Sequence, residues 1–495
     1  MITQLHTPLE AASWLRARVT GSLHADSRKV QAGDGFMAWP GAASDARQYV
    51  DEVIHAGASA CLVDVDGVEK YGFDSEKIAV YNGLKGAAAP IAAAYFEEPS
   101  KLLQTVAITG TNGKTSTAWW LAHALGQLNR KCAMVGTLGI GAPEAMVFNG
   151  LTTPDPVLLQ QQLRRFVDEG FVACAIEASS IGIAEQRLDG THFQVAVFTN
   201  FTQDHLDYHG SMQNYWAAKE SLFAWPGLAS AVINTDDAAG QALNEKLKSS
   251  CLDVWTVSIG QSARLQAETI EQNGSILKFA VVEGVDRREV TTHAVGLYNV
   301  SNLLGVMGAM RALGVSLEDA ARACCFLPLV PGRLNTLGEA GTPLVVIDYA
   351  HTPDAIEKVL VALRPVADDR GGQLWCVFGC GGDRDATKRP LMAAMAQKYS
   401  NHIVVTSDNP RSESPSAIIS QILLGLTHHE SVDVESDRAL AIAQAISRAK
   451  AEDVVLLAGK GHETWQEIGG IKHPFEDQLH ARAALHARQL MGARS

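Results

Sequence analysis

The chain has 495 residues, with 41 lysines and arginines against 54 aspartates and glutamates, so its formal net charge is −13. Hydrophobic residues make up 47% of the chain and charged residues 19%, which excludes a largely disordered protein and predicts roughly two to four globular domains. The acidic balance argues against general nucleic-acid binding, and the eight cysteines contain no C-x-x-C pair that would indicate a zinc site or a disulfide framework. No apolar stretch is long enough to span a membrane and the first residues do not resemble a signal peptide, so we expect a cytoplasmic protein.

The first predicted domain covers residues 1–98. It contains the segment Asp26-Ser27-Arg28, two turn-like stretches at 33–35 and 39–41, and then an alanine-rich helical pattern. The polar, proline-broken segment Glu97–Ser100 predicts a linker to the next domain.

Two further domains are predicted at residues 99–333 and 334–495. In both, apolar runs that end in polar or turn residues alternate with helical patterns, which is typical of a mostly parallel sheet. The expected strands are Thr105–Thr109, Val172–Ile176, Val195–Phe198, Ala231–Ile233, Leu344–Ile347, Leu374–Phe378, Ile403–Thr406 and Val454–Leu457. The predicted fold class is therefore α/β, with a mononucleotide-binding central domain and a Rossmann-like C-terminal domain.

A phosphate-binding loop is the strongest motif. The strand ending at Thr109 leads into Gly110-Thr111-Asn112-Gly113-Lys114-Thr115-Ser116, and a helical pattern follows. Glycines allow backbone N–H groups to surround phosphate oxygens, Lys114 can reach the outer phosphates, and the Thr115 hydroxyl suits Mg²⁺. The spacing departs from the strict pattern, because Ile108 stands where a glycine is required. The alternative is an ordinary glycine-rich turn after a strand.

Acidic and imidazole side chains follow the next strands. Glu177 comes directly after an apolar strand, where an Mg²⁺ ligand is expected, although any strand can end in a glutamate. The segment Asp204–His209 is dense in aspartate and histidine, which indicates either a metal-dependent site or a structural role. Lys219 lies on a helical pattern ten residues beyond His209, and the pattern alone favours a solvated lysine.

In combination these residues resemble the Mur ligase family of ATP-dependent, amide-forming enzymes of peptidoglycan precursor synthesis. The resemblance covers essentially the whole chain. Its motifs are 110–115, Glu177-Ala178-Ser179-Ser180, 204–209, Asn299 and Asp348-Tyr349-Ala350-His351-Thr352-Pro353. Three more, Asp26-Ser27-Arg28, Thr152-Thr153-Pro154 and Asp408-Asn409-Pro410-Arg411, are similar to the branch that adds the third residue, meso-diaminopimelate.

This resemblance implies a reaction and its co-substrates. The expected function is ATP-dependent addition of meso-2,6-diaminopimelate to the D-glutamate of UDP-N-acetylmuramoyl-L-alanyl-D-glutamate, through an acyl phosphate. Mg²⁺ is the implied cofactor, the partners are these small molecules, and the family default is a monomer with neither nucleic acid nor a membrane span.

The resemblance also assigns site residues. Those implied to be catalytic are Lys114, Lys219 and His205, and the implied metal ligands are Thr115, Glu177, His205 and Lys219 as a carbamate. Those implied to bind ATP are Gly110, Thr111, Asn112, Gly113, Lys114, Thr115, Ser116, Asn299, Arg333, Asp348 and His351. Those implied to bind the UDP-precursor are Ser27, Thr152, Thr153, Ser179, Glu185 and Arg187. Those implied to bind diaminopimelate are Arg384, Asp408, Asn409, Pro410, Arg411, Gly459 and Glu463.

The sequence departs from the family pattern at two single positions and in one short stretch. Ile181 stands where a histidine is usual, Leu151 where an asparagine is common, and Ala42-Ala43-Ser44 offers little side-chain capacity for substrate contacts. All of these departures concern residues that the resemblance assigns to binding of the UDP-precursor.

Other functions remain as alternatives. A folylpolyglutamate synthase shares the unusual phosphate loop but is not expected to carry 408–411 or the first domain. A nucleotide switch is disfavoured because no Asn-Lys-x-Asp motif occurs, and an NAD-linked oxidoreductase because Gly379–Gly382 lacks the G-x-G-x-x-G spacing. For Asp408–Arg411, the alternative to a binding loop is an Asn-Pro turn with a surface arginine.

Overall fold

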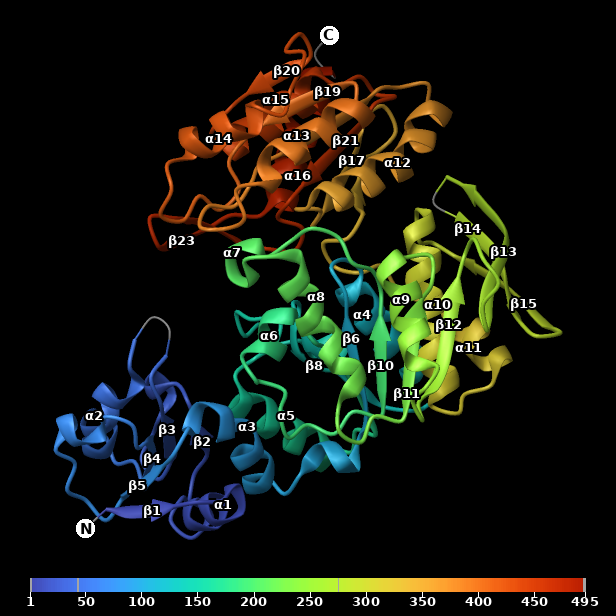
Figure 1. The fold of residues 1–495 in the computed structure, drawn as a ribbon. Helices are drawn as coiled ribbons and strands as arrows, with labels where there is room; N and C mark the ends of the chain where they lie inside the picture. The colour runs from blue at the N-terminus through green and yellow to red at the C-terminus, as the bar shows by residue number, and fades with distance from the viewer. Residues whose placement is uncertain (1, 42–43, 275, 493–495) are drawn as a thin grey trace.

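The computed structural model describes residues 2–41, 44–274 and 276–492, and most of its strands form three separate sheets (Figure 1). Each sheet takes its strands from one continuous part of the chain, at 3–81, 104–292 and 335–458. In Figure 1 the N-terminal part is blue, the central part runs from cyan to yellow, and the C-terminal part is orange to red above it. The predicted α/β class with mostly parallel sheets is confirmed, and 1–98, 99–333 and 334–495 remain our proposed domain bounds.

The N-terminal part is a parallel sheet of order β1-β5-β4-β3-β2. Its strands are β1 Thr3–Leu5, β2 Leu23–His24, β3 Gly35–Ala38, β4 Ala60–Asp64 and β5 Ile78–Tyr81. Its helices are α1 Pro8–Arg16, α2 Val50–His55 and α3 Leu84–Tyr95, with a short 3-10 helix at Ser27–Lys29. Helix α3 packs against a helix of the central part, α5, and so joins the two parts.

Only the first half of the predicted linker Glu97–Ser100, Glu97 and Glu98, is exposed, and its second half is packed. A 3-10 helix covers Pro99–Leu102, and both Pro99 and Ser100 are buried. The Ser100 hydroxyl accepts a hydrogen bond from the His192 backbone N–H at 2.9 Å. The polar serine is therefore satisfied by the central part, which is why a polar, proline-containing stretch is held against it.

The central sheet has the order β15-β14-β13-β12-β11-β10-β6-β9-β7-β8. It is parallel from β13 to β7, whereas β14, β15 and β8 are antiparallel to their neighbours. The strands are β6 Gln104–Thr109, β7 Cys132–Gly136, β8 Gly139–Gly141, β9 Ala173–Glu177, β10 Val195–Phe198, β11 Ser230–Asn234, β12 Asp253–Ser258, β13 Leu265–Asn273, β14 Ile276–Glu283 and β15 Asp286–Thr292.

Helices cover the central sheet, and their bounds are α4 Lys114–Gln127, α5 Pro156–Asp168, α6 Ser180–Ala184, α7 Leu206–His209, α8 Met212–Glu220, α9 Ala238–Leu247, α10 Leu297–Ala312 and α11 Leu317–Cys324. Helices α4 and α10 pack against each other and are buried on most sides. Two apolar clusters, one with α4 and α10 and the other with α5, enclose the strands. The sheet therefore holds β6 and β9 rigidly, and the functional loops begin at their ends.

The C-terminal sheet has the order β16-β17-β21-β18-β19-β20, and only β16 is antiparallel to its neighbour. The strands are β16 Asn335–Leu337, β17 Leu344–Asp348, β18 Leu374–Phe378, β19 His402–Val405, β20 Val432–Val434 and β21 Val454–Ala458, and a separate hairpin consists of β22 Trp465–Ile468 and β23 Ile471–Pro474. The helices are α12 Pro353–Asp369, α13 Lys388–Tyr399, α14 Pro415–Leu423, α15 Arg438–Arg448 and α16 Asp477–Gly492.

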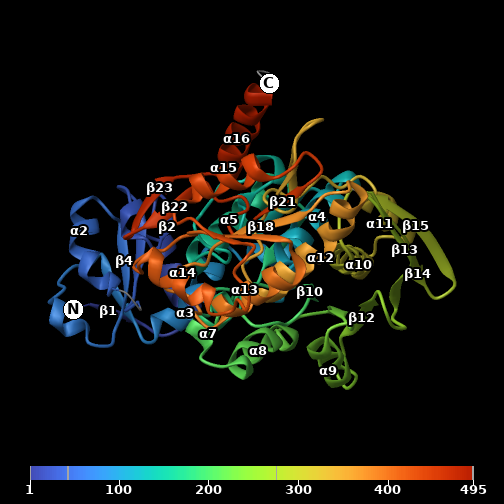
Figure 2. The same cartoon turned by 90° about the horizontal axis from the view of Figure 1, so that it is seen from above.

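Helices on both faces complete this C-terminal layer structure. Helices α12, α13 and α14 cover one face of the sheet, and α15 and α16 contribute to the apolar cluster on the other face. Figure 2 shows α16 projecting away from the other two parts. None of the helices in the described ranges is both long and apolar enough to cross a bilayer.

Candidate active site

The loop between β6 and α4 requires its two glycines. Gly110 has φ +145° and Gly113 has φ +84°, and residues other than glycine rarely adopt such positive φ angles. Space is also lacking, because a Cβ atom at Gly110 would collide with the Thr199 hydroxyl and one at Gly113 with the Asn302 side chain. The loop therefore has the tight form that was predicted for it, and α4 begins at Lys114.

Lys114 folds back over this loop. Its Nζ donates to the carbonyl oxygens of Gly110 at 2.9 Å and Thr111 at 2.8 Å. Burial lowers the pKa of Lys114 from its ordinary value, and the nearby Glu177 opposes that change. A phosphate group beside the loop would supply the negative charge that favours the protonated amine.

Thr115, in the first turn of α4, and Glu177, at the end of β9, form an oxygen-rich pair. The Thr115 hydroxyl donates to Glu177 Oε2 at 2.9 Å, and the Thr137 backbone N–H donates to Oε1 at 2.9 Å. Glu177 is fully buried, and this burial raises the pKa of its carboxyl. The pair consists of hard oxygen donors of the kind that Mg²⁺ prefers.

Lys219 is buried, which corrects the solvated lysine that the helical pattern alone favours. The side chain is 1% exposed, and its Nζ donates to the Gly110 carbonyl oxygen at 2.7 Å. Burial, and then the positive charge of Lys114, lower the pKa of Lys219 well below its ordinary value. The turn of α8 brings it inward because Tyr215, one turn earlier, is buried under the loop and lies 4.4 Å from the amine.

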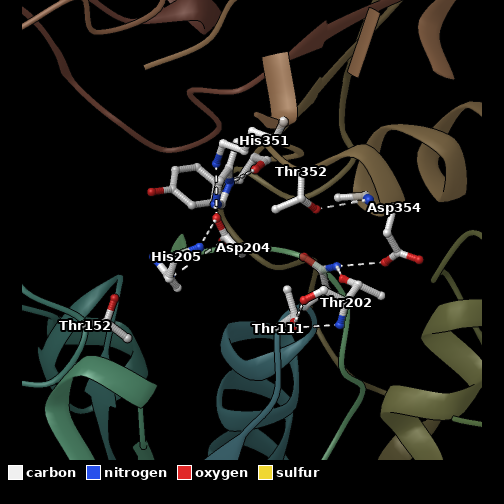
Figure 3. A network of polar contacts seen from close by, with 12 residues as sticks. Thr111, Thr152, Thr202, Asp204, His205, His351, Thr352 and Asp354 are labelled. Atoms are coloured by element: carbon white, nitrogen blue, oxygen red, sulfur yellow. Dashed lines mark hydrogen bonds and ion pairs between the residues drawn. The ribbon is translucent and has the colours of Figure 1, made fainter. Parts of the chain in front are cut away.

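Asp204 lies at the centre of a charged cluster that joins two parts of the chain (Figure 3). Its Oδ1 is 3.2 Å from the Nζ of Lys388, and its Oδ2 is 3.6 Å from His205 Nε2 and 3.8 Å from His351 Nε2. Burial opposes ionisation of Asp204, but the charge of Lys388 and the two imidazoles lower its pKa overall. Burial lowers the pKa of both His205 and His351 to about 4.

Sequence reasoning missed Lys388. It begins α13 in the C-terminal part and is buried against Asp204 in the central part, 184 residues away. The sequence gives one signal for it: Lys388 comes four residues after Arg384, which lies in the loop between β18 and α13. That signal shows which edge of the sheet it occupies but not which residue it contacts.

Two more hydrogen bonds connect the same parts. Asn112 Nδ2 donates to Asp354 Oδ2 at 2.8 Å, and Gln203 Nε2 donates to the Thr387 hydroxyl at 2.8 Å. The phosphate loop therefore faces the N-terminal end of α12, and the segment around Gln203 faces that of α13.

The residues expected around the nucleotide gather at the same junction. Arg333 donates from Nη2 to the Thr115 hydroxyl at 3.4 Å, and its guanidinium lies 4.6 Å from the centre of the Tyr349 ring. Asp348 accepts a hydrogen bond from the Leu334 backbone N–H at 2.9 Å. Asn299 lies on α10 and contacts Asn302, whose side chain faces Gly113.

The residues expected around the precursor line the other side of Glu177. The Thr153 hydroxyl donates to the Glu177 carbonyl oxygen at 2.7 Å and lies 2.9 Å from Ser179 Oγ. Thr152 lies 3.0 Å from the Thr137 hydroxyl, and Arg187 donates to the Thr153 carbonyl oxygen at 3.0 Å. These side chains form one continuous polar wall.

Two other precursor residues are placed differently. The carboxylate of Glu185 is 2.7 Å from Lys85 of the N-terminal part and accepts a hydrogen bond from Tyr208, so it already has partners. Ser27 belongs to the 3-10 helix that ends at Lys29. Burial raises the pKa of Asp155, and the charges of Lys29 and Arg187 oppose that change. Residues 42–43, for which weak substrate contacts were expected, lie outside the described residues.

Three loops of the C-terminal sheet open at the same edge, as predicted. Asn409 Nδ2 donates to Glu463 Oε2 at 2.8 Å, and a Cβ at Gly459 would collide with the Asp408 carboxylate. Arg411 Nη1 donates to the Gly382 carbonyl oxygen at 2.7 Å. The loop after β18 thus meets the 408–411 loop, and Arg384 and Pro410 flank the contact.

One aromatic contact bridges the precursor side and this C-terminal edge. The ring of Phe148, four residues before Thr152, lies 4.9 Å from the ring of Trp465 in β22. Among the residues that the structure describes, no group of three or more histidine, cysteine, aspartate or glutamate side chains is arranged to hold a metal ion.

A phosphate loop on one parallel sheet faces the polar loops of a second, which defines a nucleotide-dependent α/β enzyme. Residues 108–310 match the family model "Mur ligase middle domain", and residues 332–461 match "Mur ligase, glutamate ligase domain". The chain belongs to the Mur ligase family, whose members are ATP-dependent, amide-bond-forming ligases.

Two curated relatives are similar over nearly their whole length. A UDP-N-acetylmuramoyl-L-alanyl-D-glutamate--2,6-diaminopimelate ligase of Acidovorax sp. (strain JS42) is 57% identical over 491 residues, covering 98% of this chain and 98% of the relative. The protein of the same name from Janthinobacterium sp. (strain Marseille) is 48% identical, with 97% of each chain covered.

Solved structures are similar as well. A structure titled as a UDP-N-acetylmuramoyl-L-alanyl-D-glutamate--2,6-diaminopimelate ligase matches with a TM-score of 0.64 and 32% identity, covering 94% of this chain and 95% of that chain. The MurF ligase from Thermotoga maritima in complex with ADP matches with a TM-score of 0.68 at 17% identity, covering 96% of this chain and 99% of that chain, which supports the fold.

Proposed function

We propose that this chain is an ATP-dependent ligase that adds meso-2,6-diaminopimelate to the D-glutamate of UDP-N-acetylmuramoyl-L-alanyl-D-glutamate during peptidoglycan precursor synthesis. One observation carries the proposal: the Asp408–Arg411 loop opens at the same sheet edge as two other polar loops, facing the phosphate loop. The names of the full-length relatives support this choice of substrates.

The reaction needs an activated carboxylate, because joining a carboxylate to an amine in water is unfavourable. The γ-phosphoryl group of ATP passes to the γ-carboxylate of the D-glutamyl residue, which gives an acyl phosphate and ADP. The amine of diaminopimelate then attacks the acyl carbon, phosphate leaves, and the nitrogen loses a proton. The protein contributes mainly position and charge neutralisation, for which Lys114 and the loop N–H groups are suited.

Mg²⁺ fits the residues at the loop. Thr115 and Glu177 supply two hard oxygens that already lie 2.9 Å apart, and Glu177 is buried with only polar partners. When bound, this ion would polarise the phosphates and offset their charge. Thr115 and Glu177 would hold one ion, and Glu177, His205 and a carbamate of Lys219 would hold a second.

A carbamate on Lys219 is chemically reasonable because the amine is buried and its pKa is far below the ordinary value. A neutral amine adds CO₂ and releases a proton, and the product is an anion that can bind a metal. That anion would also pair with Lys114, whose Nζ donates to the same carbonyl oxygen.

The remaining assignments follow the layout of the loops. Asn299, Arg333, Asp348 and His351 contact ATP, while Ser27, Thr152, Thr153, Ser179 and Arg187 contact the precursor. Arg384, Asp408, Asn409, Arg411, Gly459 and Glu463 contact diaminopimelate. We further propose a cytoplasmic monomer that acts on these small molecules.

A coupled assay tests the function. Release of phosphate from ATP by the purified chain is measured with the UDP-dipeptide alone, with diaminopimelate alone, and with both. We expect release only with both, and no release when L-glutamate and a folate replace them. If phosphate is released at the same rate without the UDP-dipeptide, a simple nucleotide hydrolase would be favoured and the proposal overturned.

A further inference from the structure

Residues 326–334 carry the chain from the central part to the C-terminal part, and helix α4 holds the first half of this segment. The Trp120 Nε1–H donates to the Pro328 carbonyl oxygen at 3.0 Å, and Gln127 Nε2 donates to the Phe326 carbonyl oxygen at 3.2 Å. Trp120 is 5% exposed, so water competes little for its hydrogen bond. The same helix begins in the phosphate loop.

The C-terminal part holds the other end of the 326–334 segment. The Leu334 backbone N–H donates to Asp348 Oδ2 at 2.9 Å, and Gly332 packs so closely that a Cβ atom there would collide with the His462 backbone. Gly332 has φ +69° and Leu334 has φ +47°, so both residues adopt left-handed conformations. A residue with a side chain keeps such a conformation only where its surroundings enforce it, so this end is firmly fixed.

Arg333 lies close to this fixed end, and its side chain turns back to the start of α4. Its Nη2 donates to the Thr115 hydroxyl at 3.4 Å, whereas its Nε is buried and has no hydrogen-bond partner among the described residues. A buried N–H of a cationic group without a partner points to an anion that is still to bind. Helix α4 therefore contacts the segment both through Trp120 and through Thr115.

Two prolines make the stretch between these contacts stiff. Pro328 and Pro331 each have a fixed φ angle, and each also restricts the residue before it. Those preceding residues, Leu327 and Val330, are buried in the apolar cluster that includes α4. A shift of the backbone at Pro328 is therefore passed on to Arg333 and is not absorbed between them.

We propose that Trp120 is a positioning residue, whose indole N–H fixes the 326–334 segment on α4 and thereby places the Arg333 guanidinium against the phosphates of ATP. This rests on the proposed function, in which Arg333 contacts ATP. Trp120 acts through the backbone of the segment and not by contact with the nucleotide. Because α4 also carries Lys114 and Thr115, one rigid helix sets the spacing of these two side chains and of Arg333 around the phosphates.

Two neighbouring tryptophans give a matched pair of variants. Trp120→Phe keeps an aromatic ring in the core and removes the N–H. Trp119→Phe makes the same change at a residue that is 7% exposed and whose Nε1 has no hydrogen-bond partner among the described residues. Binding of magnesium ATP to the full-length wild type and to each variant is measured by calorimetry, without the UDP-dipeptide or diaminopimelate. The KM values for all three substrates are measured on the same samples.

We expect Trp120→Phe to bind ATP about three- to tenfold more weakly, as for the loss of one neutral hydrogen bond, and its KM for ATP to rise to match. The KM values for the UDP-dipeptide and diaminopimelate should not change, and Trp119→Phe should behave like the wild type. A lower unfolding temperature of Trp120→Phe without any change in ATP affinity would overturn the proposal. Equal losses of ATP affinity in the two variants would overturn it as well.

A double-variant cycle tests whether Trp120 acts through Arg333. In an Arg333→Met background, where the guanidinium is absent, Trp120→Phe should cause little further loss of ATP affinity. If Trp120→Phe weakens ATP binding by the same factor with and without the guanidinium, Trp120 does not position Arg333 and the proposal is wrong.

The outcomes separate this proposal from the function on which it rests. If the wild type binds no ATP or forms no amide with diaminopimelate, the proposed function fails. If the wild type does both and Trp120→Phe binds ATP equally well, only the role of Trp120 fails. Should Trp120→Phe be unstable, Gln127→Ala removes the exposed hydrogen bond to the same segment and should weaken ATP binding about twofold. An unchanged ATP affinity of Gln127→Ala would then refute the positioning of this segment by α4.

Discussion

The side chains of Lys114 and Lys219 donate to the same carbonyl oxygen, that of Gly110, at 2.9 and 2.7 Å. Two ammonium groups this close in a buried site repel each other, and burial makes each charge less favourable. The pKa of Lys219 falls furthest, so Lys219 is the member of the pair that is expected to be neutral. In the proposed reaction, Lys114 is therefore the cation that faces the phosphates, and Lys219 is the amine that adds CO₂.

Replacing Lys219 tests the second of these roles. Lys219→Ala should reduce turnover by several orders of magnitude, and small carboxylic acids should restore part of it, because they can occupy the place of a carbamate. Lys248→Ala, which changes a lysine that is 65% exposed, is the control and should behave like the wild type. Full activity of Lys219→Ala without added acid would contradict the carbamate.

Lys114→Ala should lower turnover by orders of magnitude while the protein stays folded. Among the residues that the structure describes, Lys114 donates only to backbone carbonyls of its own loop, so its loss leaves the sheet and α4 intact. Activity and thermal unfolding are measured on the same sample. Near-normal turnover of Lys114→Ala would contradict a phosphate-binding role for Lys114.

The Asp204–Lys388 pair should stabilise the contact between the central and C-terminal parts. Both side chains are buried, and breaking a buried ion pair by removing one partner costs roughly 3–5 kcal/mol. Lys388→Met should therefore reduce turnover and lower the unfolding temperature. In the double variant with Asp204→Asn the effects should be far from additive; strict additivity would mean that the two residues act separately.

Arg411→Ala should impair use of diaminopimelate by about two orders of magnitude in kcat/KM, as expected when a charge-assisted pair is lost. Because the contacts of Arg411 with the described residues lie within the C-terminal part, the KM values for ATP and the UDP-dipeptide should stay unchanged. Arg411→Lys should not restore activity fully, since lysine lacks the planar fork that binds a carboxylate bidentately. A wild type that accepts L-lysine equally well would refute this account of selectivity.

Acid should destabilise the protein, partly through His462. Burial, and then the charge of Arg333, lower the pKa of His462 to about 4, whereas the unfolded chain has the ordinary value near 6.5. Below about pH 6.5 the unfolded chain therefore takes up a proton that the folded protein does not, and stability falls as the pH falls towards 4. His462→Gln should flatten this slope by up to about 1.4 kcal/mol per pH unit, measured by denaturant unfolding between pH 7 and 4.5. An identical slope in the variant would exclude a contribution from His462.

Local features were predictable from the sequence, and contacts between distant segments were not. The phosphate loop and Glu177 could be predicted because strand, glycines and helix are contiguous, and because parallel strands end at one edge. The burial of Lys219 could not be predicted from the sequence. It depends on packing of α8 against the phosphate loop, and Lys219 and its acceptor Gly110 are 109 residues apart in the chain. For the same reason Lys388 was missed.

The amino-acid loops show a similar division. The positions of Asp408–Arg411 and Glu463 follow from parallel strands, but the backbone hydrogen bonds between Arg411 and the β22–β23 hairpin do not. These bonds need Arg411 in a left-handed backbone conformation, which the sequence does not reveal because an arginine rarely adopts it. Glu185 was assigned from the family pattern, whereas its partners Lys85 and Tyr208 became visible only in three dimensions.

The contact between Phe148 and Trp465 joins the segment proposed to bind the precursor to the hairpin beside the proposed diaminopimelate site. Phe148 lies on the segment that leads to Thr152, and Trp465 immediately precedes the residues that hold the Arg411 loop. In the proposed reaction, this contact would help to keep bulk solvent away from the acyl phosphate until the amine attacks it. We therefore expect that the fidelity of the reaction, measured as amide bonds formed per ATP consumed, depends on this pair of rings even though neither takes part in the chemistry.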